Sequence, residues 1–276
     1  MHPTLFEIGG HAIMTYGVLT ASGYLLGALW MWVHHEDMGM SLWQFFILMY
    51  CIVGGAVLGA KAGFYLVEWR DFSADPMWFL KNWRHGWVFW SGFIGTLVSA
   101  KVYQEGFNAF FAPKKRYLPP ADYFGVSLPL GHVLGRLGCF AQGCCHGRPT
   151  ELPWGVTFTD PSSSVKPELL NLPLHPVQLY EAAGELAIAV WIMRWLLPRI
   201  REGKFRYGTA FFGYIGLYSV LRFFTETFRG DDRGLFLSAW LSPSQWWSIG
   251  GLMIAAVALW RNGIEETSPT KRSLYF

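Results

Sequence analysis

Long apolar stretches separated by short polar segments dominate the chain, and a soluble core would be interrupted by polar residues far more often. A helix needs about 20 mostly apolar residues to cross a bilayer. By this rule the pattern predicts seven membrane-spanning helices, over residues 12–33, 43–67, 87–103, 122–140, 177–197, 207–226 and 244–260. No linker rich in Pro, Gly or Ser divides the chain and no repeat is visible. We therefore expect an all-α integral membrane protein, with residues 1–276 forming a single polytopic membrane domain.

Composition agrees with this interpretation. Hydrophobic residues make up 52% of the 276 residues and charged residues only 15%, whereas a typical soluble domain is about 25% charged. These values exclude a disordered protein, a collagen-like fibre and a small disulfide-stapled secreted domain. The net charge of +3 is too small, and too evenly spread, to indicate a nucleic-acid partner.

The charges outside the predicted spans indicate an orientation. Lys and Arg are more frequent in the segments that follow the first, third, fifth and seventh spans, as in the run Lys114, Lys115 and Arg116. The positive-inside rule then places the N-terminus outside and the C-terminus in the cytoplasm. The sizeable loops 68–86, 141–176 and 227–243 fall on the outer side. Because loops carry function more often than the elements they join, we expect the active region near the outer face.

A few charges remain at membrane depth, where a lipid-facing charge costs at least ~2.5 kcal/mol. Arg136 is flanked by Gly135 and Gly138, which leave room for another group to approach its guanidinium. Arg222, Glu226 and Arg229 recur at a spacing that places them on one helix face. One interpretation is a buried ion-pair network that fixes helix packing. The other is an anion site, because two arginines can hold a phosphate with forked hydrogen bonds, and in a membrane the obvious phosphate is a phospholipid headgroup.

Two further segments carry residues of chemical interest. The segment HPVQLYE, residues 175–181, combines His, Gln, Tyr and Glu at one predicted membrane interface, which is more than anchoring requires. Cys139, Cys144 and Cys145 cluster in the sequence, but C-x4-C-C-H is not a common zinc spacing and adjacent cysteines rarely chelate one ion well. Small apolar packing is the favoured role for the cysteines; a disulfide, a metal site and a reactive thiol are the alternatives.

Gly55, Gly59 and Gly63 recur every four residues and predict close packing of the second span on a neighbour.

Taken in order, these segments resemble the prolipoprotein diacylglyceryl transferase family over most of the chain. The segment GRLGCF at 135–140 falls on that family's GRxGNF signature, HPVQLYE matches HPxQLYE, and RFFTETFR at 222–229 matches RFxxExxR. The segments HAIMTYG at 11–17, GAKAG at 59–63, FWSGFIG at 89–95 and residues 242–251 are similar to further family segments at the same places. No single motif is specific, but their order and spacing together are.

The resemblance implies a function. Members of this family are transferases of the bacterial cytoplasmic (inner) membrane that span it several times. They move the diacylglyceryl group of phosphatidylglycerol to the lipobox cysteine thiol of a prolipoprotein, releasing glycerol 1-phosphate. The implied partners are phosphatidylglycerol, the signal-peptide region of the prolipoprotein and membrane lipids, with no nucleic acid, no metal and no organic cofactor.

The resemblance also implies a site. Arg136 and Arg222 would hold the phosphate in the catalytic centre together with Glu226, which would orient them with Arg229. The substrate-binding residues would be Tyr16, Lys61, Gly92, Gly135, Gly138, His175, Gln178, Tyr180, Glu181 and Arg229.

Three positions depart from the family pattern. Trp90 replaces a family His that can serve as base for the acceptor thiol, Lys61 replaces an Arg and keeps its charge without the forked geometry, and Cys139 replaces the signature Asn. His132, one turn before Arg136, and Glu226 are the candidate substitute bases. The departures leave open a related transferase with a phospholipid donor and another acceptor, or a non-catalytic lipid-binding or thiol-redox membrane protein.

Overall fold

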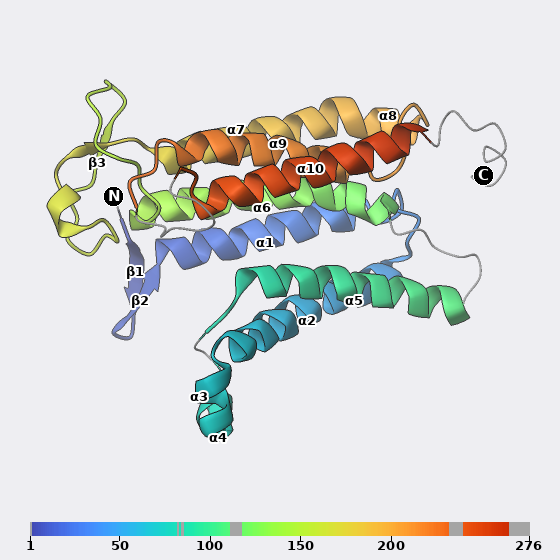
Figure 1. Cartoon of the computed structure of the whole chain (residues 1–276), viewed down its shortest axis with the longest axis horizontal. Coiled ribbons are helices and arrows are strands. Elements are labelled where there is room, and N and C mark those ends of the chain that lie inside the picture. The colour runs from blue at the N-terminus through green and yellow to red at the C-terminus, as the bar shows by residue number, and fades with distance from the viewer. Residues whose placement is uncertain (1, 82, 84–85, 111–117, 232–239, 265–276) are drawn as a thin grey trace. The chain divides into compact units, whose positions relative to one another are not determined.

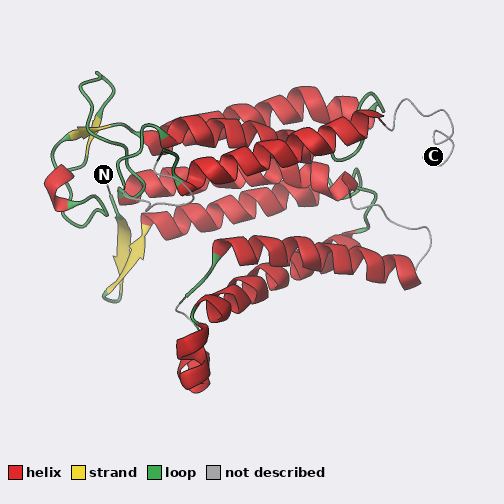
Figure 2. Cartoon of the chain, viewed as in Figure 1, coloured by secondary structure: helices red, strands yellow, loops and turns green. Residues whose placement is uncertain are grey.

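The computed structural model describes residues 2–81, 83, 86–110, 118–231 and 240–264. The chain divides into two compact units. Unit 1 comprises Met1–Met31 and Pro120–Phe276, and unit 2 comprises Trp32–Pro119. Helices make up most of both units, as Figure 2 shows in red. The predicted all-α class is thus confirmed, apart from two small two-stranded sheets among the described residues.

Unit 1 holds five long helical segments. They are α1 (Thr15–Val33), α6 (Leu118–Gln142), α7 (Val177–Trp191) with its continuation through a π-helical turn (Ile192–Leu196) into α8 (Leu197–Arg201), α9 (Thr209–Glu226) and α10 (Pro243–Ile264). Helix α9 packs against both α7 and α10 (Figure 1). The π-helical turn directly precedes Pro198 at the start of α8, where the chain loses one backbone N–H.

Glycines let α1 approach α6 closely. A Cβ added to Gly23 would lie 2.6 Å from the carbonyl oxygen of Gly131, and one added to Gly27 would lie 3.0 Å from Ser127 Oγ. Only a residue without a side chain fits at such a distance from a neighbouring backbone. This contact brings the start of α1 to the end of α6, where Gly138 faces Tyr16.

A buried carboxylate fixes the start of α9. Asp122, only 1% exposed on α6, accepts hydrogen bonds from the backbone N–H groups of Gly208 (2.7 Å), Ala210 (2.8 Å) and Phe211 (3.2 Å). These N–H groups belong to the first turn of a helix, which has no intrahelical acceptors for them. Asp122 therefore caps α9 from another helix and sets the register of α9 against α6.

The loop after α6 joins three elements at one end of unit 1. The backbone N–H of Gly147 donates to His175 O and that of Arg148 donates to Phe228 O, at 3.0 and 2.9 Å. Short strands β3 (Val156–Thr157) and β4 (Pro173–Leu174) pair antiparallel, with a 3-10 turn at Pro167–Leu169 between them. Phe158 and Leu174 form a small apolar core beneath this loop. The loop thus ties the beginning of α7 to the end of α9.

Unit 2 contains α2 (Leu42–Val67), the short helices α3 (Trp69–Ala74) and α4 (Pro76–Lys81), and α5 (Phe89–Phe110). Helix α2 packs along α5. A Cβ at Gly59 would meet Gly95 Cα at 3.0 Å, and Cβ atoms at Gly55 and Gly63 would lie closer still to Ser99 Oγ and Ser91 Oγ. The predicted close packing of the glycine stripe is therefore confirmed, and the neighbour is α5.

Each of the seven predicted segments is helical, but with different ends. The segment predicted from residue 12 begins as a helix only at Thr15, because His11–Met14 (β2) pairs with Thr4–Ile8 (β1) across a turn at Gly9 and Gly10, both with positive φ. Among the described residues, three helices are long and apolar enough to cross a membrane: Thr15–Val33, Leu42–Val67 and Pro119–Gln142.

Candidate active site

Glu181 lies at the centre of a buried cluster of charged side chains in unit 1. It is fully buried on the first turns of α7. Its Oε2 lies 2.5 Å from Arg136 Nη2 of α6, and its Oε1 lies 3.4 Å from Arg222 Nη1 of α9 and 3.5 Å from Arg229 Nη1. Three arginines from distant parts of the sequence therefore converge on one carboxylate.

A second layer of partners surrounds the arginines. Arg222 Nη2 lies 2.5 Å from Glu226 Oε2 and donates to Ser244 Oγ at 3.0 Å. Ser242 Oγ donates to Glu226 Oε1 at 2.8 Å. Both serines stand at the start of α10, so this helix completes the cluster.

Arg229 lies just beyond the end of α9, where it makes two parallel hydrogen bonds of 2.8 Å to Asp231. Burial disfavours its charge, but the hydrogen bonds to Asp231 and to the Cys145 side chain outweigh burial and raise the pKa of Arg229 above its ordinary value. The three arginine charges are thus opposed by Glu181, Glu226 and Asp231.

Two arginine N–H groups in the cluster are left over. Arg136 Nε and Arg229 Nη1 are buried and make no hydrogen bond with the residues that the structure describes. Most buried polar groups in proteins are hydrogen-bonded. Unused donors beside three positive charges are suited to an anionic oxygen ligand.

One turn further along α7, Glu185 forms a second polar contact. It is fully buried, and its Oε1 lies 2.6 Å from Nδ1 of His132 and 3.5 Å from the hydroxyl of Tyr214. The ring of His132 also lies 5.4 Å from that of Tyr218. A buried carboxylate that orients an imidazole is an arrangement found in proton-transfer sites. The sequence suggested two candidate bases. Glu226 is ion-paired with Arg222 and accepts a hydrogen bond from Ser242, whereas His132 contacts Glu185 through Nδ1.

Three further residues of HPVQLYE, His175, Gln178 and Tyr180, lie next to the loop after α6 and are called the rim below. Tyr180 hydroxyl accepts from Trp154 Nε1 at 2.8 Å and lies 3.2 Å from His175 Nδ1. Burial, together with the nearby Arg148 charge, lowers the pKa of His175, so its ring stays neutral at neutral pH. Gln178, fully buried, donates to the Cys144 carbonyl at 2.8 Å.

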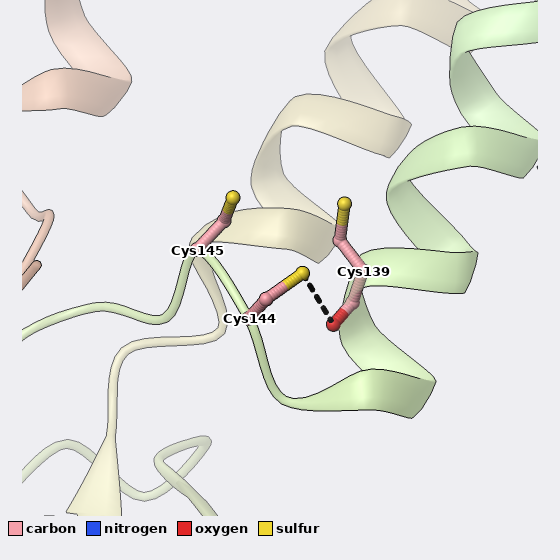
Figure 3. Close-up of side chains that lie close together, drawn as sticks. All are labelled: Cys139, Cys144 and Cys145. Atoms are coloured by element: carbon pink, nitrogen blue, oxygen red, sulfur yellow. Dashed lines mark hydrogen bonds between the residues drawn. The ribbon is translucent and has the colours of Figure 1, made fainter. Parts of the chain in front are cut away.

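The three clustered cysteines lie next to this rim (Figure 3). Cys139 is on the last turns of α6, and Cys144 and Cys145 follow in the loop. Their sulfur atoms all lie within 4.8 Å of one another, and each residue is half-buried with a free thiol. Packing, the role that the sequence favoured for the cysteines, does not by itself explain this geometry. Three possible ligand atoms for a metal ion meet at one place.

The other predicted residues of unit 1 fall around this cluster. Gly138 provides a close approach, since a Cβ there would lie 3.2 Å from the Tyr16 ring. At Gly135 a Cβ would meet no atom within 4 Å, so the space beside it is open. Tyr16 remains 42% exposed at the start of α1.

Two predicted residues belong to unit 2. Gly92 of α5 lies against Ala56 and Ala60 of α2, where it serves helix packing. Lys61 is 2% exposed; its Nζ donates to Gly86 O at 3.1 Å and lies 4.4 Å from the Trp87 ring. A role of either residue in binding substrate stays a prediction. Trp90 is in α5, and its side chain lies outside the described residues.

Sequence reasoning missed Ser242, Ser244 and Trp154 as partners of the site. A signal for Ser242 was present, because the S-x-x-Q pattern before an apolar run predicts a helix start, and Ser242 and Gln245 do form this reciprocal cap. Nothing in the pattern indicated that Ser242 also reaches Glu226.

Comparisons with known proteins agree with the resemblance in the sequence. A family model described as "Prolipoprotein diacylglyceryl transferase" matches residues 3–261. The phosphatidylglycerol–prolipoprotein diacylglyceryl transferase of Clostridium tetani is 31% identical over 256 residues, which cover 92% of this chain and 95% of that relative. The protein of the same name from Vibrio vulnificus is 31% identical over 280 residues, covering 98% and 96% of the two chains. That from Cupriavidus pinatubonensis is 32% identical over 270 residues, covering 94% and 90%.

Proposed function

Because the chain belongs to the prolipoprotein diacylglyceryl transferase family, we propose that it transfers the diacylglyceryl group of phosphatidylglycerol to a prolipoprotein cysteine at the cluster around Glu181. The acceptor is the signal-peptide region of the prolipoprotein, and the lipid comes from the surrounding membrane. The enzyme works in the bacterial inner membrane, crossed seven times, with the N-terminus outside.

The convergence of Arg136, Arg222 and Arg229 on Glu181 carries this proposal. In the reaction, the acceptor thiolate attacks a glyceryl carbon of the lipid and a C–S bond forms. The C–O bond to the phosphate breaks, and glycerol 1-phosphate leaves with the electron pair. Negative charge therefore grows on the phosphate as the bond breaks. Fixed hydrogen-bond donors aimed at such developing charge supply the largest part of the rate enhancement in many enzymes.

The unused donors give the phosphate a place to bind. Arg136 Nε and Arg229 Nη1 make no hydrogen bond with described residues, so two oxygens of a phosphate can be bound there without breaking an existing hydrogen bond. Gln178 Oε1 is also buried without a hydrogen-bond partner among these residues, and it can accept a hydrogen bond from a glycerol hydroxyl of the headgroup. Glu181 and Glu226 then keep the guanidinium groups in place.

The test is a transfer assay with the full chain in lipid nanodiscs that contain phosphatidylglycerol. We expect a lipobox peptide to gain the mass of a diacylglyceryl group on its cysteine, with release of an equal amount of glycerol phosphate. A matched peptide with serine in place of the cysteine should stay unmodified, and nanodiscs of phosphatidylethanolamine should give little product. Modification of the serine peptide, or glycerol phosphate release without peptide modification, would show that the acceptor is a different molecule.

The topology is tested separately. Single cysteines introduced at residues 68–81 and near the C-terminus of a cysteine-free variant should react with a membrane-impermeant thiol reagent only from opposite sides of sealed vesicles. Reaction of both from the same side would contradict seven crossings.

A further inference from the structure

Three cysteines outside the arginine cluster form an arrangement that the transfer reaction, as described so far, does not use. The sulfurs of Cys139, Cys144 and Cys145 lie within 4.8 Å of one another, and all three side chains are half-buried. Figure 3 shows Cys139 on the helix and the two adjacent cysteines on the loop that turns back toward it. The Cys144 thiol donates a weak hydrogen bond of 3.8 Å to the Cys139 carbonyl.

Adjacent cysteines rarely chelate one ion, and the local backbone shows how these two can. Cys145 has a φ of +61°, in the left-handed region that few residues with a side chain adopt, and it follows Gly143 at +78°. The turn is held by the hydrogen bond from buried Gln178 to the Cys144 carbonyl. An unusual backbone that is fixed by its surroundings is typical of functional sites. Here it turns the thiols of neighbouring residues toward the same region.

The distances suit a metal ion bound by sulfur. Zinc–sulfur bonds of about 2.3 Å place two sulfurs on a tetrahedral ion about 3.8 Å apart. Sulfurs that already lie within 4.8 Å need to move by about 1 Å or less, which small side-chain rotations provide.

The charges nearby also suit such an ion. Three thiolates around Zn²⁺ carry a net charge of −1. The positive charges of Arg229 and Arg136 lie close enough to act on Cys145 and Cys139, respectively. Such outer partners hold metal ligands in place and stabilise their charge.

We propose that Cys139, Cys144 and Cys145 bind one zinc ion, whose fourth position accepts the cysteine thiol of the acceptor. This second part rests on the proposed function. Zinc sites with three protein ligands and an open position are the catalytic type, and a thiol that coordinates zinc is deprotonated. The acceptor thiol would bind as thiolate and release its proton to water at the half-exposed cluster. The thiolate would then attack the lipid carbon, and glycerol 1-phosphate would leave. The proposal departs from the absence of metal that the family resemblance implies.

The first experiment measures metal without any assay of activity. The full-length protein, purified in detergent and loaded with zinc, should retain about one zinc per chain after removal of free metal. The double variant Cys139→Ser, Cys145→Ser should fall to background, whereas Cys51→Ser, which changes the fourth cysteine on α2, should retain the wild-type amount. The proposed zinc site would be overturned if the double variant kept the wild-type zinc content. It would also be overturned if the wild-type protein bound copper in place of zinc, or if two of the three cysteines formed a disulfide.

The second experiment examines the open position. When cobalt(II) replaces zinc, the thiolate ligands give a charge-transfer absorption band, and this band changes when a further thiolate binds. A lipobox peptide should alter this absorption, and the matched serine peptide should not. Equal changes with both peptides, or no change with either, would overturn the role of the fourth position.

A transfer assay then separates this inference from the proposed function. Removal of zinc should lower the transfer rate by more than about tenfold, and zinc should restore it. The variant Cys51→Ser should keep the wild-type rate when zinc is bound, because Cys51 lies outside the cluster. Full transfer by zinc-free protein, or by the double variant Cys139→Ser, Cys145→Ser, would overturn the zinc role and leave the transferase function intact. Zinc and peptide binding with no transfer would support the metal site and contradict the proposed function.

Discussion

The two units of the chain bury positive charge in different ways. In unit 1, Arg136, Arg222 and Arg229 meet the carboxylate of Glu181, and Glu226, Asp231 and Ser244 bind others of their donors. In unit 2, Lys61 is just as deeply buried, and its contacts include a backbone carbonyl and the faces of aromatic rings.

This difference indicates different roles. A guanidinium bound to a carboxylate is held in one orientation and still has planar N–H donors for a ligand. In unit 1, Arg136 Nε and Arg229 Nη1 make no hydrogen bond with described residues. A lysine held over aromatic rings by cation–π attraction is stabilised as a cation, but its ammonium group lacks the planar forked geometry that matches a phosphate. The arginine cluster is therefore the better candidate for binding a phosphate, although both positions lie in segments that resemble family motifs.

The largest expected effect tests whether Glu181 holds the arginines. The variant Glu181→Gln leaves buried guanidinium groups without their shared carboxylate, so we expect the free energy of unfolding to fall by about 3–5 kcal/mol. Unfolding in detergent by added SDS measures this change. Glu105→Gln is the control: Glu105 pairs with Lys101 on the surface at 2.6 Å, where such pairs contribute about 0–1 kcal/mol. Equal effects of the two variants would contradict a central role for Glu181.

The next prediction separates charge from geometry at Arg136. Arg136→Lys keeps the charge but loses the forked donors, and we expect kcat/KM for transfer to fall about 10²–10³-fold. Arg201→Lys is the matched control on α8, where Arg201 donates to the Tyr123 hydroxyl far from the reacting groups. Its rate should stay within about threefold. If Arg136→Lys retains the wild-type rate, only positive charge is needed there.

The buried carboxyl group of Asp122 extends the comparison, because its hydrogen-bond partners among the described residues are backbone N–H groups. Asp122→Ala leaves the N–H groups of Gly208 and Ala210 without an acceptor, and we expect a loss of about 1–3 kcal/mol in unfolding free energy. Asp160→Ala, which removes a surface turn contact to Ser162, should cost less than about 0.5 kcal/mol. A negligible effect of Asp122→Ala would show that α9 does not need this cap.

The smallest expected effect concerns Lys61. Lys61→Met removes the cation from its aromatic surroundings and should lower the unfolding free energy by about 0.5–2 kcal/mol. We expect KM for phosphatidylglycerol to change by less than about twofold. A tenfold rise in KM with unchanged stability would instead support the headgroup role that the family resemblance implies, and the contrast between the two units would disappear.

Sequence patterns predicted the elements and the arginine cluster well, because both depend on local spacing. Arg222, Glu226 and Arg229 share one face by helix periodicity alone, and they do form one ion-pair group. Glu181 was among the predicted residues, but its central position was not predicted, since it depends on how α6, α7 and α9 pack.

Other features were not predictable from spacing. The approach of the cysteine sulfurs requires the left-handed backbone of Cys145, and the late start of α1 requires the pairing of β2 with β1. The hydrogen bonds between Asp231 and Arg229 depend on the turn after α9, which the spacing does not specify.

The central claim is that the arginine cluster binds the lipid phosphate, and an experimental structure of the chain in phosphatidylglycerol nanodiscs tests it most directly. We predict phosphate density within hydrogen-bonding distance of Arg136 Nε and of Arg229, with Glu181 still in contact with Arg136. A map in which the lipid phosphate lies elsewhere, while the arginines contact only carboxylates and serines, would contradict the claim and show that the cluster serves helix packing alone.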